Sequence, residues 1–329
     1  MKRIGVPAVP DFLTAEVSSC KPRAAHARRL AGSSARLHVL RSILGLAALL
    51  AMGSTWAQPL FLRDDRGTEH RFDALPQRIV SLMPSLTETA WVLGVGVRLV
   101  GVDNHSNWPS DIAALPRLGG LDDTQIEAVA RLKPDLVLAS TSARSLDKLE
   151  ALGFKVVRLK SDSHGDVRRT MGLVARLLGA PQSAERVWAQ VEADIASAAA
   201  RVPPTLRGRR LYFEIGGGPY AAGTSSFIGE TLSRLGLVNI VPPEQGPFPK
   251  LNPEFVVRAR PELIMGAVRE QAALLARPGW QQMPAVQQCR LCGFENAHYE
   301  MLIRPGPRLG EAAGVLADCL ARLGKGPSR

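Results

Sequence analysis

The sequence contains one segment twice, first as Ile126-Glu127-Ala-Val-Ala-Arg-Leu-Lys-Pro134-Asp135-Leu136-Val137 and later as Pro253-Glu254-Phe-Val-Val-Arg-Ala-Arg-Pro261-Glu262-Leu263-Ile264. In each copy a glutamate opens an amphipathic stretch, a proline follows seven residues later, and an acid leads into an apolar run. The two glutamates are 127 positions apart. A repeat of this kind predicts one α/β lobe used twice, with a ligand held between the two lobes.

Another short segment also occurs twice, once before each copy of the first repeat. Glu88-Thr89 leads to Leu93-Gly94 in the first half, and Glu230-Thr231 leads to Leu235-Gly236 in the second. Each predicts a helix that stops at its glycine, and Ser85 is expected to cap the first of these helices. Because the order of the two helices is the same in both halves, this pair supports the prediction of two similar lobes.

Apolar runs alternate with helical segments in both halves, which predicts parallel βαβ packing. Strands are expected at residues 78–82, 98–102, 136–139, 155–159, 210–214 and 263–265. Between the halves, residues 166–201 form a nearly unbroken helical pattern, interrupted only at Gly179-Ala-Pro181. The predicted fold is therefore α/β, with two similar lobes built on mostly parallel sheets and joined by a single long backbone helix. The expected boundaries are 58–165, 166–204 and 205–329.

The N-terminus carries a targeting segment. Arg41 precedes a short apolar run, and Gly53-Ser-Thr-Trp-Ala57 supplies a small-x-small site, which together predict a signal peptide at 36–57 cleaved after Ala57. The alternative is an uncleaved anchor helix, for which the apolar run is short. Residues 1–35 fit no fold and are set aside as an unstructured extension or an over-extended start. The expected location is the periplasm.

The charge of the chain argues against a nucleic-acid ligand once this segment is removed. Residues 1–57 hold eight Lys and Arg against two acids, so the formal net charge of +11 falls to +5 for the mature chain. No run of Lys and Arg with interleaved aromatic residues remains.

The glycines Gly216-Gly-Gly do not form a dinucleotide fingerprint, and no catalytic triad or paired-carboxylate spacing is present. We therefore expect a non-enzymatic protein.

The mature chain contains the cysteines Cys289, Cys292 and Cys319. A disulfide is the usual state in an exported protein, and one of the first two is expected to bridge to Cys319 on the last helix. The sequence leaves open which of the two does so. The Cys289-Arg-Leu-Cys292 spacing also suits a thiol-redox role, which is the alternative from a different functional class.

These segments resemble a known family over residues 78–320. The resemblance rests on Arg78-Ile-Val-Ser-Leu-Met-Pro-Ser-Leu-Thr-Glu88, Val100-Gly-Val102 with Trp108-Pro109, Leu132-Lys-Pro-Asp-Leu-Val137, Gly218-Pro-Tyr220, Pro247-Phe248-Pro249 and Arg304-Pro-Gly-Pro-Arg308. The chain resembles the periplasmic substrate-binding proteins of iron-siderophore, haem and cobalamin ABC importers, and the cobalamin branch most of all. The resemblance implies that a monomer captures a corrinoid, with no cofactor of its own. It would deliver this ligand to an inner-membrane permease dimer with ATPase subunits. Haem or a ferric siderophore is the alternative ligand.

Glu127 and Glu254 match the positions at which this family meets arginines on the permease. A structural alternative exists for both, since Thr124-Gln-Ile-Glu127 fits a capping box and Glu254 follows Asn252-Pro253 in a first helical turn. Capping does not require an equivalent glutamate in each lobe, so we expect permease docking with capping as an added role.

The resemblance also implies which residues line the ligand pocket. They are His105, Trp108 and Leu121 from the first lobe and Tyr220, Phe248 and Arg304 from the second. A flat macrocycle with apolar faces and polar edges suits aromatic walls with a few hydrogen-bond donors. The alternatives are a core position for Phe248 and a solvated surface position for Arg304. Trp91 lies at helical spacing among apolar residues and is expected in the core.

Two positions differ from the cobalamin branch. Leu121 stands where that branch has a tryptophan, and His105 stands where it has a tyrosine. Imidazole is a good ligand for cobalt or iron, so His105 is a candidate axial ligand as well as a hydrogen-bonding cleft residue. A single long connecting helix resists bending, and we expect little movement of the lobes when the ligand binds.

Overall fold

The computed structural model describes residues 59–143 and 146–325, which lie within one compact unit, Ala57–Arg329. The signal peptide predicted at 36–57 and the extension at 1–35 lie almost wholly outside that unit, and none of their residues is described. Of the helices in the described ranges, none combines the length and apolarity that a bilayer crossing requires.

The first lobe is built on a four-stranded sheet in which all strands run parallel. Its spatial order is β4-β3-β5-β6. The strands are β3 (Ile79–Ser81), β4 (Leu99–Val102), β5 (Leu136–Ser140) and β6 (Val156–Leu159), and the helices are α2 (Pro84–Val92), α3 (Ile126–Arg131) and α4 (Asp147–Ala151). An antiparallel hairpin precedes the sheet, formed by β1 (Leu60–Arg63) and β2 (Glu69–Phe72).

The second lobe repeats this arrangement. Its parallel strands are β7 (Arg210–Ile215), β9 (Val238–Asn239), β10 (Leu263–Ala267) and β11 (Leu291–Phe294), and β8 (Tyr220–Ala221) pairs antiparallel with the end of β7. The spatial order of these parallel strands is β9-β7-β10-β11. In both lobes, therefore, the second strand of the chain lies at one edge, followed across the sheet by the first, the third and the fourth. The helices are α7 (Phe227–Arg234), α8 (Pro253–Ala259), α9 (Gln271–Leu275), α10 (Pro284–Gln287) and α11 (Asn296–Leu302). This shared topology confirms the repeat predicted from the sequence.

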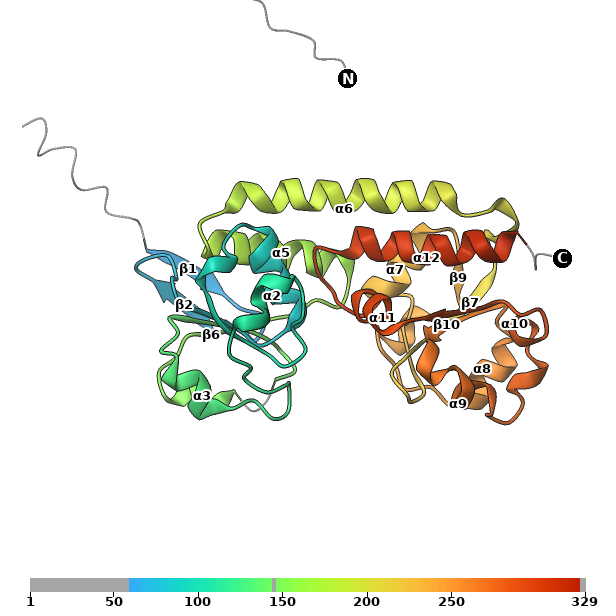
Figure 1. Cartoon of the computed structure of the whole chain (residues 1–329), viewed down its shortest axis with the longest axis horizontal. Helices are drawn as coiled ribbons and strands as arrows, with labels where there is room; N and C mark the ends of the chain where they lie inside the picture. Colours follow the sequence, from blue (N-terminus) through green and yellow to red (C-terminus); the bar gives the residue numbers. More distant parts are fainter. Residues whose placement is uncertain (1–58, 144–145, 326–329) are drawn as a thin grey trace, which may run out of the picture. The chain divides into compact units, whose positions relative to one another are not determined.

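Two helices connect the sheets, and a third closes the chain. These are α5 (His164–Leu177), α6 (Pro181–Arg201) and α12 (Leu309–Gly324). Figure 1 shows α6 lying alongside α12. The break at Gly179 that the sequence predicts is present, since Gly179 has a φ of +76° between α5 and α6. Single-turn 3-10 helices occur at Gly96–Arg98, Ser110–Ala114, Pro204–Leu206, Pro243–Gln245, Val268–Glu270 and Trp280–Gln282.

The repeated segment has a structural role that explains its acid. In the first lobe, the Asp135 carboxylate accepts hydrogen bonds from the backbone N–H groups of Gln77 and Arg78, just before β3. In the second lobe, Glu262 accepts the equivalent bond from the backbone N–H of Arg210 at the start of β7. The acid after each proline therefore fixes the first strand of its lobe beside the third.

The two helices that carry the Glu-Thr pairs, α2 and α7, are each followed by the expected glycine, but α2 does not begin where the sequence predicts. Gly94 and Gly236 both have a φ of +84°, a left-handed conformation that glycine adopts without strain. The predicted cap at Ser85 is wrong. Met83 is the N-cap of α2 and makes no side-chain capping bond, while Ser85 lies inside the first turn with a buried hydroxyl that has no hydrogen-bond partner. Pro84 occupies the first helical position, and it starts the helix one residue before the serine.

One large apolar core runs through both lobes and the connecting helices. It includes Leu138 of β5, Met265 of β10 and Ile195 of α6, and Trp91 packs against it at its edge, as predicted. Two smaller cores fill the outer layers, one around Val129 and one around Trp280. Because the large core is continuous between the sheets, apolar packing as well as the connecting helix holds the lobes together.

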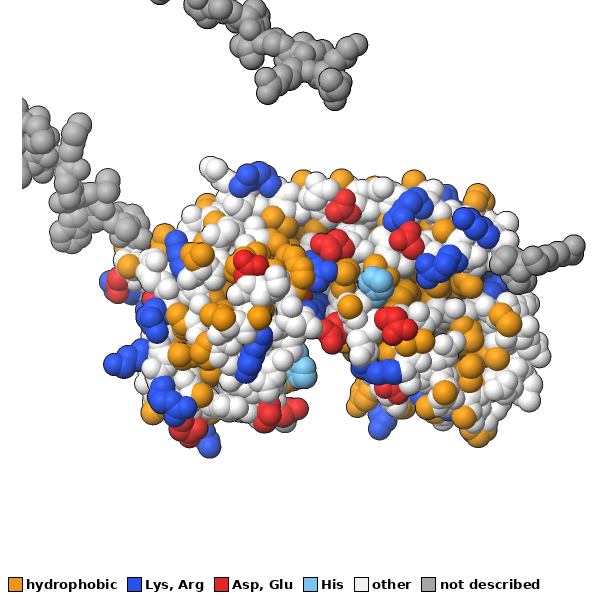
Figure 2. Space-filling model, in the orientation of Figure 1, with side chains coloured by type: hydrophobic (Ala, Val, Ile, Leu, Met, Phe, Trp, Pro, Cys, Tyr) orange, Lys and Arg blue, Asp and Glu red, His pale blue; other side chains and the backbone are white. Residues whose placement is uncertain are grey.

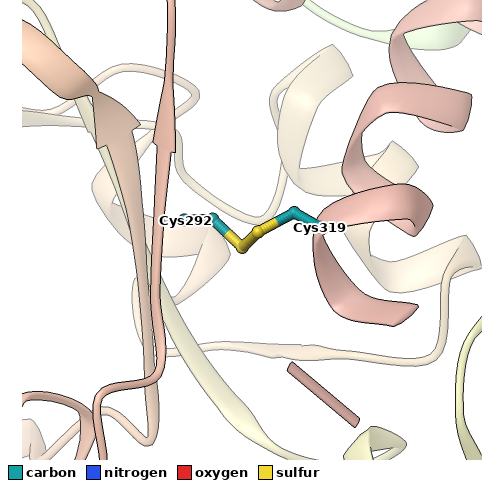
Figure 3. Close-up of a disulfide and its surroundings, with 2 residues drawn as sticks. All are labelled: Cys292 and Cys319. Carbon is teal, nitrogen blue, oxygen red and sulfur yellow. A yellow bond between two sulfur atoms is a disulfide. The ribbon is translucent and has the colours of Figure 1, made fainter. Parts of the chain in front are cut away.

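The disulfide links Cys292 on β11 to Cys319 on α12 (Figure 3), with a Cα–Cα distance of 6.1 Å. The expected bridge to Cys319 is confirmed, and the partner that the sequence left open is Cys292. Cys289 lies before β11, not on it, with a φ of +51° and an exposed free thiol. The Cys289/Cys292 redox pair therefore does not form.

Candidate functional site

A cleft opens between the two lobes, and residues from both line it. A first cavity of about 420 Å3 is lined mainly by the first lobe, and a second of about 350 Å3 lies next to it. Both have in their walls Met83, Ser140, Ser142, Ile303 and Pro305. Since they share these residues, the two cavities form one continuous cleft, and Figure 2 shows the hollow between the lobes.

Five of the six predicted pocket residues line this cleft. His105, Leu121 and Arg304 line the first cavity, and Tyr220 and Phe248 line the second. Leu121 and Tyr220 are exposed by 42% and 48%, as the wall of an open cleft would be. The ring of Phe248 also packs edge to face against Phe227, with 5.8 Å between the ring centroids. Phe248 is therefore both a wall of the cleft and part of the apolar packing.

Trp108 lines neither cavity. The guanidinium of Arg308 lies 4.8 Å from the centre of its indole ring, and the Trp108-Pro109 peptide bond is cis. It therefore belongs to the rim near α12 and not to the walls described above.

Arg304 is not a solvated surface residue, because its Nη atoms are committed to hydrogen bonds within the protein. It is 9% exposed, and its two Nη atoms make four hydrogen bonds. Nη1 donates to Glu88 Oε1 at 2.9 Å and to Asn107 Oδ1 at 2.8 Å, and Nη2 donates to the His105 carbonyl and Glu300 Oε2, both at 2.9 Å. Arg304 therefore ties α2 and the His105 loop of the first lobe to the second lobe.

Glu88, the partner of Arg304, lies almost fully buried on α2. Burial raises the pKa of its carboxyl above the ordinary value, and the hydrogen bond and charge of Arg304 oppose this shift. Arg308 adds a second cation at 4.0 Å. The glutamate of the first Glu-Thr segment is thus part of a buried ion pair between the lobes.

The glutamate of the second Glu-Thr segment also reaches out of its own lobe. Glu230 on α7 accepts a hydrogen bond from the backbone N–H of His164, the first residue of α5, at 2.6 Å. The His164 imidazole Nε2 lies 2.8 Å from the Thr231 hydroxyl and 3.1 Å from the Phe227 carbonyl. Burial lowers the pKa of His164, although the nearby Glu230 carboxylate opposes the shift. The repeated glutamate therefore marks a second connection between the halves.

Sequence reasoning missed several cleft residues. Ser140 ends β5, Thr141 and Ser142 follow it, and Arg269 lies just beyond β10. In open α/β sheets ligands bind beyond the carboxyl ends of the strands, so the position of these residues after predicted strands was the available signal. Arg269 donates to Asn296 Oδ1 at 2.7 Å, and its Nε lies 3.4 Å from Glu270 Oε1.

His105 is placed where a metal-bearing ligand could reach it. The residue is exposed and lines the first cavity, and its backbone N–H donates to the Asp103 carboxylate at 2.7 Å. Throughout the described part of the chain, no group of three or more His, Cys, Asp or Glu side chains is arranged to hold a metal ion. Among the residues that line the two cavities, His105 carries the imidazole that a ligand could reach.

Glu127 and Glu254 are exposed in the first turns of α3 and α8. Glu254 lies in the first turn of α8, as expected, and Asn252 caps this helix by accepting from the backbone N–H of Glu254 at 2.9 Å. The capping box predicted at Thr124 is wrong, because Gln125 is the N-cap of α3 and the Thr124 hydroxyl donates to the Gly120 carbonyl. Glu127 therefore has no capping-box role, although its place in the first turn of α3 suits a carboxylate.

The cleft and the exposed glutamates are connected in the same way in each lobe. Leu121 precedes Glu127 by six residues, and Phe248 precedes Glu254 by six residues. Both cleft residues therefore occupy equivalent positions of the repeat, and a short segment joins each cleft wall to the helix that carries its glutamate.

The chain is similar to known proteins over most of its length. An uncharacterised ABC transporter substrate-binding lipoprotein of Bacillus subtilis is 26% identical over 273 residues, covering 80% of this chain and 85% of the relative. The periplasmic vitamin B12 binding protein of Vibrio cholerae is 26% identical with a TM-score of 0.63, covering 76% of this chain and 98% of that structure. The periplasmic haem-binding protein of Roseiflexus sp. RS-1, in apo form, is 28% identical with a TM-score of 0.64, covering 75% of this chain and 99% of that structure.

The sequence pattern of the periplasmic binding protein family matches residues 79–295, from the start of β3 to the end of β11. This span contains both sheets and most of the cleft. The chain therefore belongs to the periplasmic binding protein family and has the substrate-binding role of an ABC importer.

Proposed function

We propose that this protein captures a corrinoid in the cleft and delivers it to an ABC permease in the inner membrane. The observation that carries the proposal is the cleft itself, with apolar walls from both lobes and polar groups along its edge. Such walls suit the faces of a flat macrocycle, and the serines and Arg269 suit its polar rim. The vitamin B12 binding protein of similar fold supports this ligand class.

Haem is the second candidate, and one observation favours it. His105 presents an imidazole to the first cavity, and a structure of similar fold is a haem-binding protein. An iron porphyrin with an open axial position could take this imidazole as a ligand. The ligand experiment must therefore separate corrinoids from haem.

Residues 58–329 would be titrated by calorimetry with cyanocobalamin, dicyanocobinamide and hemin in separate experiments. Binding of both corrinoids, with no binding of hemin, supports the proposal. Binding of hemin alone, with a Soret band that shifts on the substitution His105→Ala, assigns the protein to haem and refutes the corrinoid proposal.

The role of Phe248 gives a second test within the same assay. The substitution Phe248→Ala removes an aromatic wall and should weaken corrinoid binding about tenfold, since an aromatic contact contributes about 1 kcal/mol beyond its buried area. The matched control is Phe61→Ala, because Phe61 is 68% exposed on the β1–β2 hairpin and outside the cleft. Equal affinities for the Phe248 variant and the control would contradict the proposed site.

We further propose that Glu127 and Glu254 dock the two lobes onto the permease dimer. Both are exposed at equivalent positions of the repeat, and α3 and α8 lie on the side of the molecule away from α6 (Figure 1). Exposed charges of this kind set the rate and register of association. The protein would act as a monomer, exported by a signal peptide that is cleaved after Ala57.

A further inference from the structure

The two docking helices repeat more than their glutamates. Arginine follows each glutamate by four residues, as Arg131 and Arg258, and a second base follows by six, as Lys133 and Arg260. All four bases are exposed. The same three charges, one acid and two bases, therefore occur in the same register at the tip of each lobe.

The last base of each set occupies a backbone position that favours glycine. Lys133 has a φ of +47° and Arg260 has a φ of +45°, and both follow the end of their helix. Side chains with a Cβ adopt this left-handed region at a cost that glycine does not have. Both copies nevertheless carry a long cation there, and such a deviation often marks a functional position.

Neither cation has a structural partner that would explain it. In residues 59–143 and 146–325, no ion pair or hydrogen bond involves the side chains of Lys133 or Arg260. Arg131 and Arg258 lie in the last turn of their helices, where a cation is favoured by the helix dipole, so they have an ordinary explanation. Arg260 is the C-cap of α8 and Lys133 directly follows the C-cap of α3, so the dipole favours a cation at these positions too. Since Arg131 and Arg258 already supply that charge, the dipole does not account for a second cation on a left-handed backbone.

We propose that Lys133 and Arg260 belong to the permease-docking surface, so that each lobe docks through one glutamate and one base. The proposal rests on the docking role given above to Glu127 and Glu254. It implies that each half of the permease presents an acidic side chain beside the basic group that meets the glutamate. The mixed sign of the unit fits a protein partner better than an anionic lipid surface, which would repel the glutamate.

The test is the double variant Lys133→Gly/Arg260→Gly, measured with the host organism's permease–ATPase complex in nanodiscs. We expect docking to weaken at least tenfold, with a smaller dependence on salt, while the Tm is unchanged or higher because glycine relieves the left-handed backbone. Binding of cyanocobalamin should not change. Lys133→Asn/Arg260→Asn should give the same loss of docking, and Lys133→Arg/Arg260→Lys should retain it.

A matched control removes two exposed charges elsewhere, as Arg186→Gln/Arg322→Gln on α6 and α12. The proposal is refuted if the control weakens docking equally, or if the glycine variant leaves docking intact. Loss of binding to anionic phospholipid vesicles, with unchanged docking to the permease, would assign the two bases to the membrane surface and would also overturn it.

The variant Glu127→Gln/Glu254→Gln separates this inference from the docking role on which it rests. If this variant abolishes docking while the glycine variant docks normally, only the role of the two bases is wrong. If neither variant affects docking, the docking surface itself is wrong.

Discussion

The ion pair between Arg304 and Glu88 gives a prediction that joins stability to the architecture of the cleft. At 2.9 Å and an effective dielectric constant of about 20, the attraction of the two charges is roughly 6 kcal/mol. The desolvation of two buried ions costs several kcal/mol each, so the intact pair contributes little net stability. The substitution Arg304→Ala instead leaves the buried Glu88 carboxylate without its main partner, and we expect it to destabilise the protein by about 3–5 kcal/mol at pH 8.

The pH dependence of this loss identifies its cause. The pKa of Glu88 is already raised by burial, and removing Arg304 raises it further because the opposing cation is gone. A carboxyl whose pKa is raised on folding stabilises the folded protein when it is protonated. This contribution to the free energy of unfolding is lost as the pH rises through the folded pKa. The destabilisation by Arg304→Ala should therefore be larger at pH 8 than at pH 5.

The measurement is guanidinium unfolding of residues 58–329 at both pH values, with thermal unfolding alongside. A loss of 3–5 kcal/mol corresponds to a fall in Tm of roughly 6–20 °C for a chain of this size. The control is Arg201→Ala, which breaks an exposed pair with Asp318 and should cost less than about 1 kcal/mol. The double variant Glu88→Gln/Arg304→Ala should be more stable than Arg304→Ala at pH 8. If it is not, the unpaired carboxylate is not the cause and the reasoning is refuted.

Three further expectations follow from other parts of the structure. Reducing the disulfide, which closes a loop with a sequence separation of 27 between Cys292 and Cys319, should lower stability by about 3.5 kcal/mol in denaturant titrations with and without dithiothreitol; an unchanged midpoint would contradict the bridge. Burial lowers the pKa of His164, so this residue contributes stability that is present above its ordinary pKa of 6.5 and is lost as the pH falls through the lower folded pKa. The substitution His164→Gln should therefore flatten the acid side of a plot of unfolding free energy against pH. Identical plots for the variant and the wild type would contradict this role of His164. Small-angle scattering should show little contraction on ligand binding, since α6 and the Arg304 connection both restrain the lobes, and a large contraction would show that these restraints are weak.

Much of the architecture followed from the sequence because its signals are local. A proline with an acid behind it, a glycine at a helix end and an apolar run depend on a few neighbouring residues, and all recur in both halves. The repeat therefore predicted two lobes, and the break at Gly179 predicted how the connecting helices are divided. The cleft residues Tyr220 and Phe248 were reached through family resemblance, since neither has a local pattern that marks it as a wall.

The errors arose where a side chain had several partners to choose from. Ser85 and Thr124 both stand where a capping residue is expected, but helix α2 begins at Pro84 and the Thr124 hydroxyl bonds to its own loop at Gly120. The pattern identifies residues that can cap, whereas the path of the preceding loop decides whether they do.

The sequence alone determined the two-lobe repeat, the exposed glutamate in each lobe and the presence of a bridge to Cys319. Only the tertiary structure decided that Cys292 is the partner, that Arg304 is buried against Glu88, and that Leu121 and Phe248 occupy equivalent places in the two halves of one cleft. The physical reason is distance along the chain. Helix ends and strands depend on neighbours within a few residues, whereas Arg304 and Glu88 are 216 residues apart and meet only when the two lobes pack against each other.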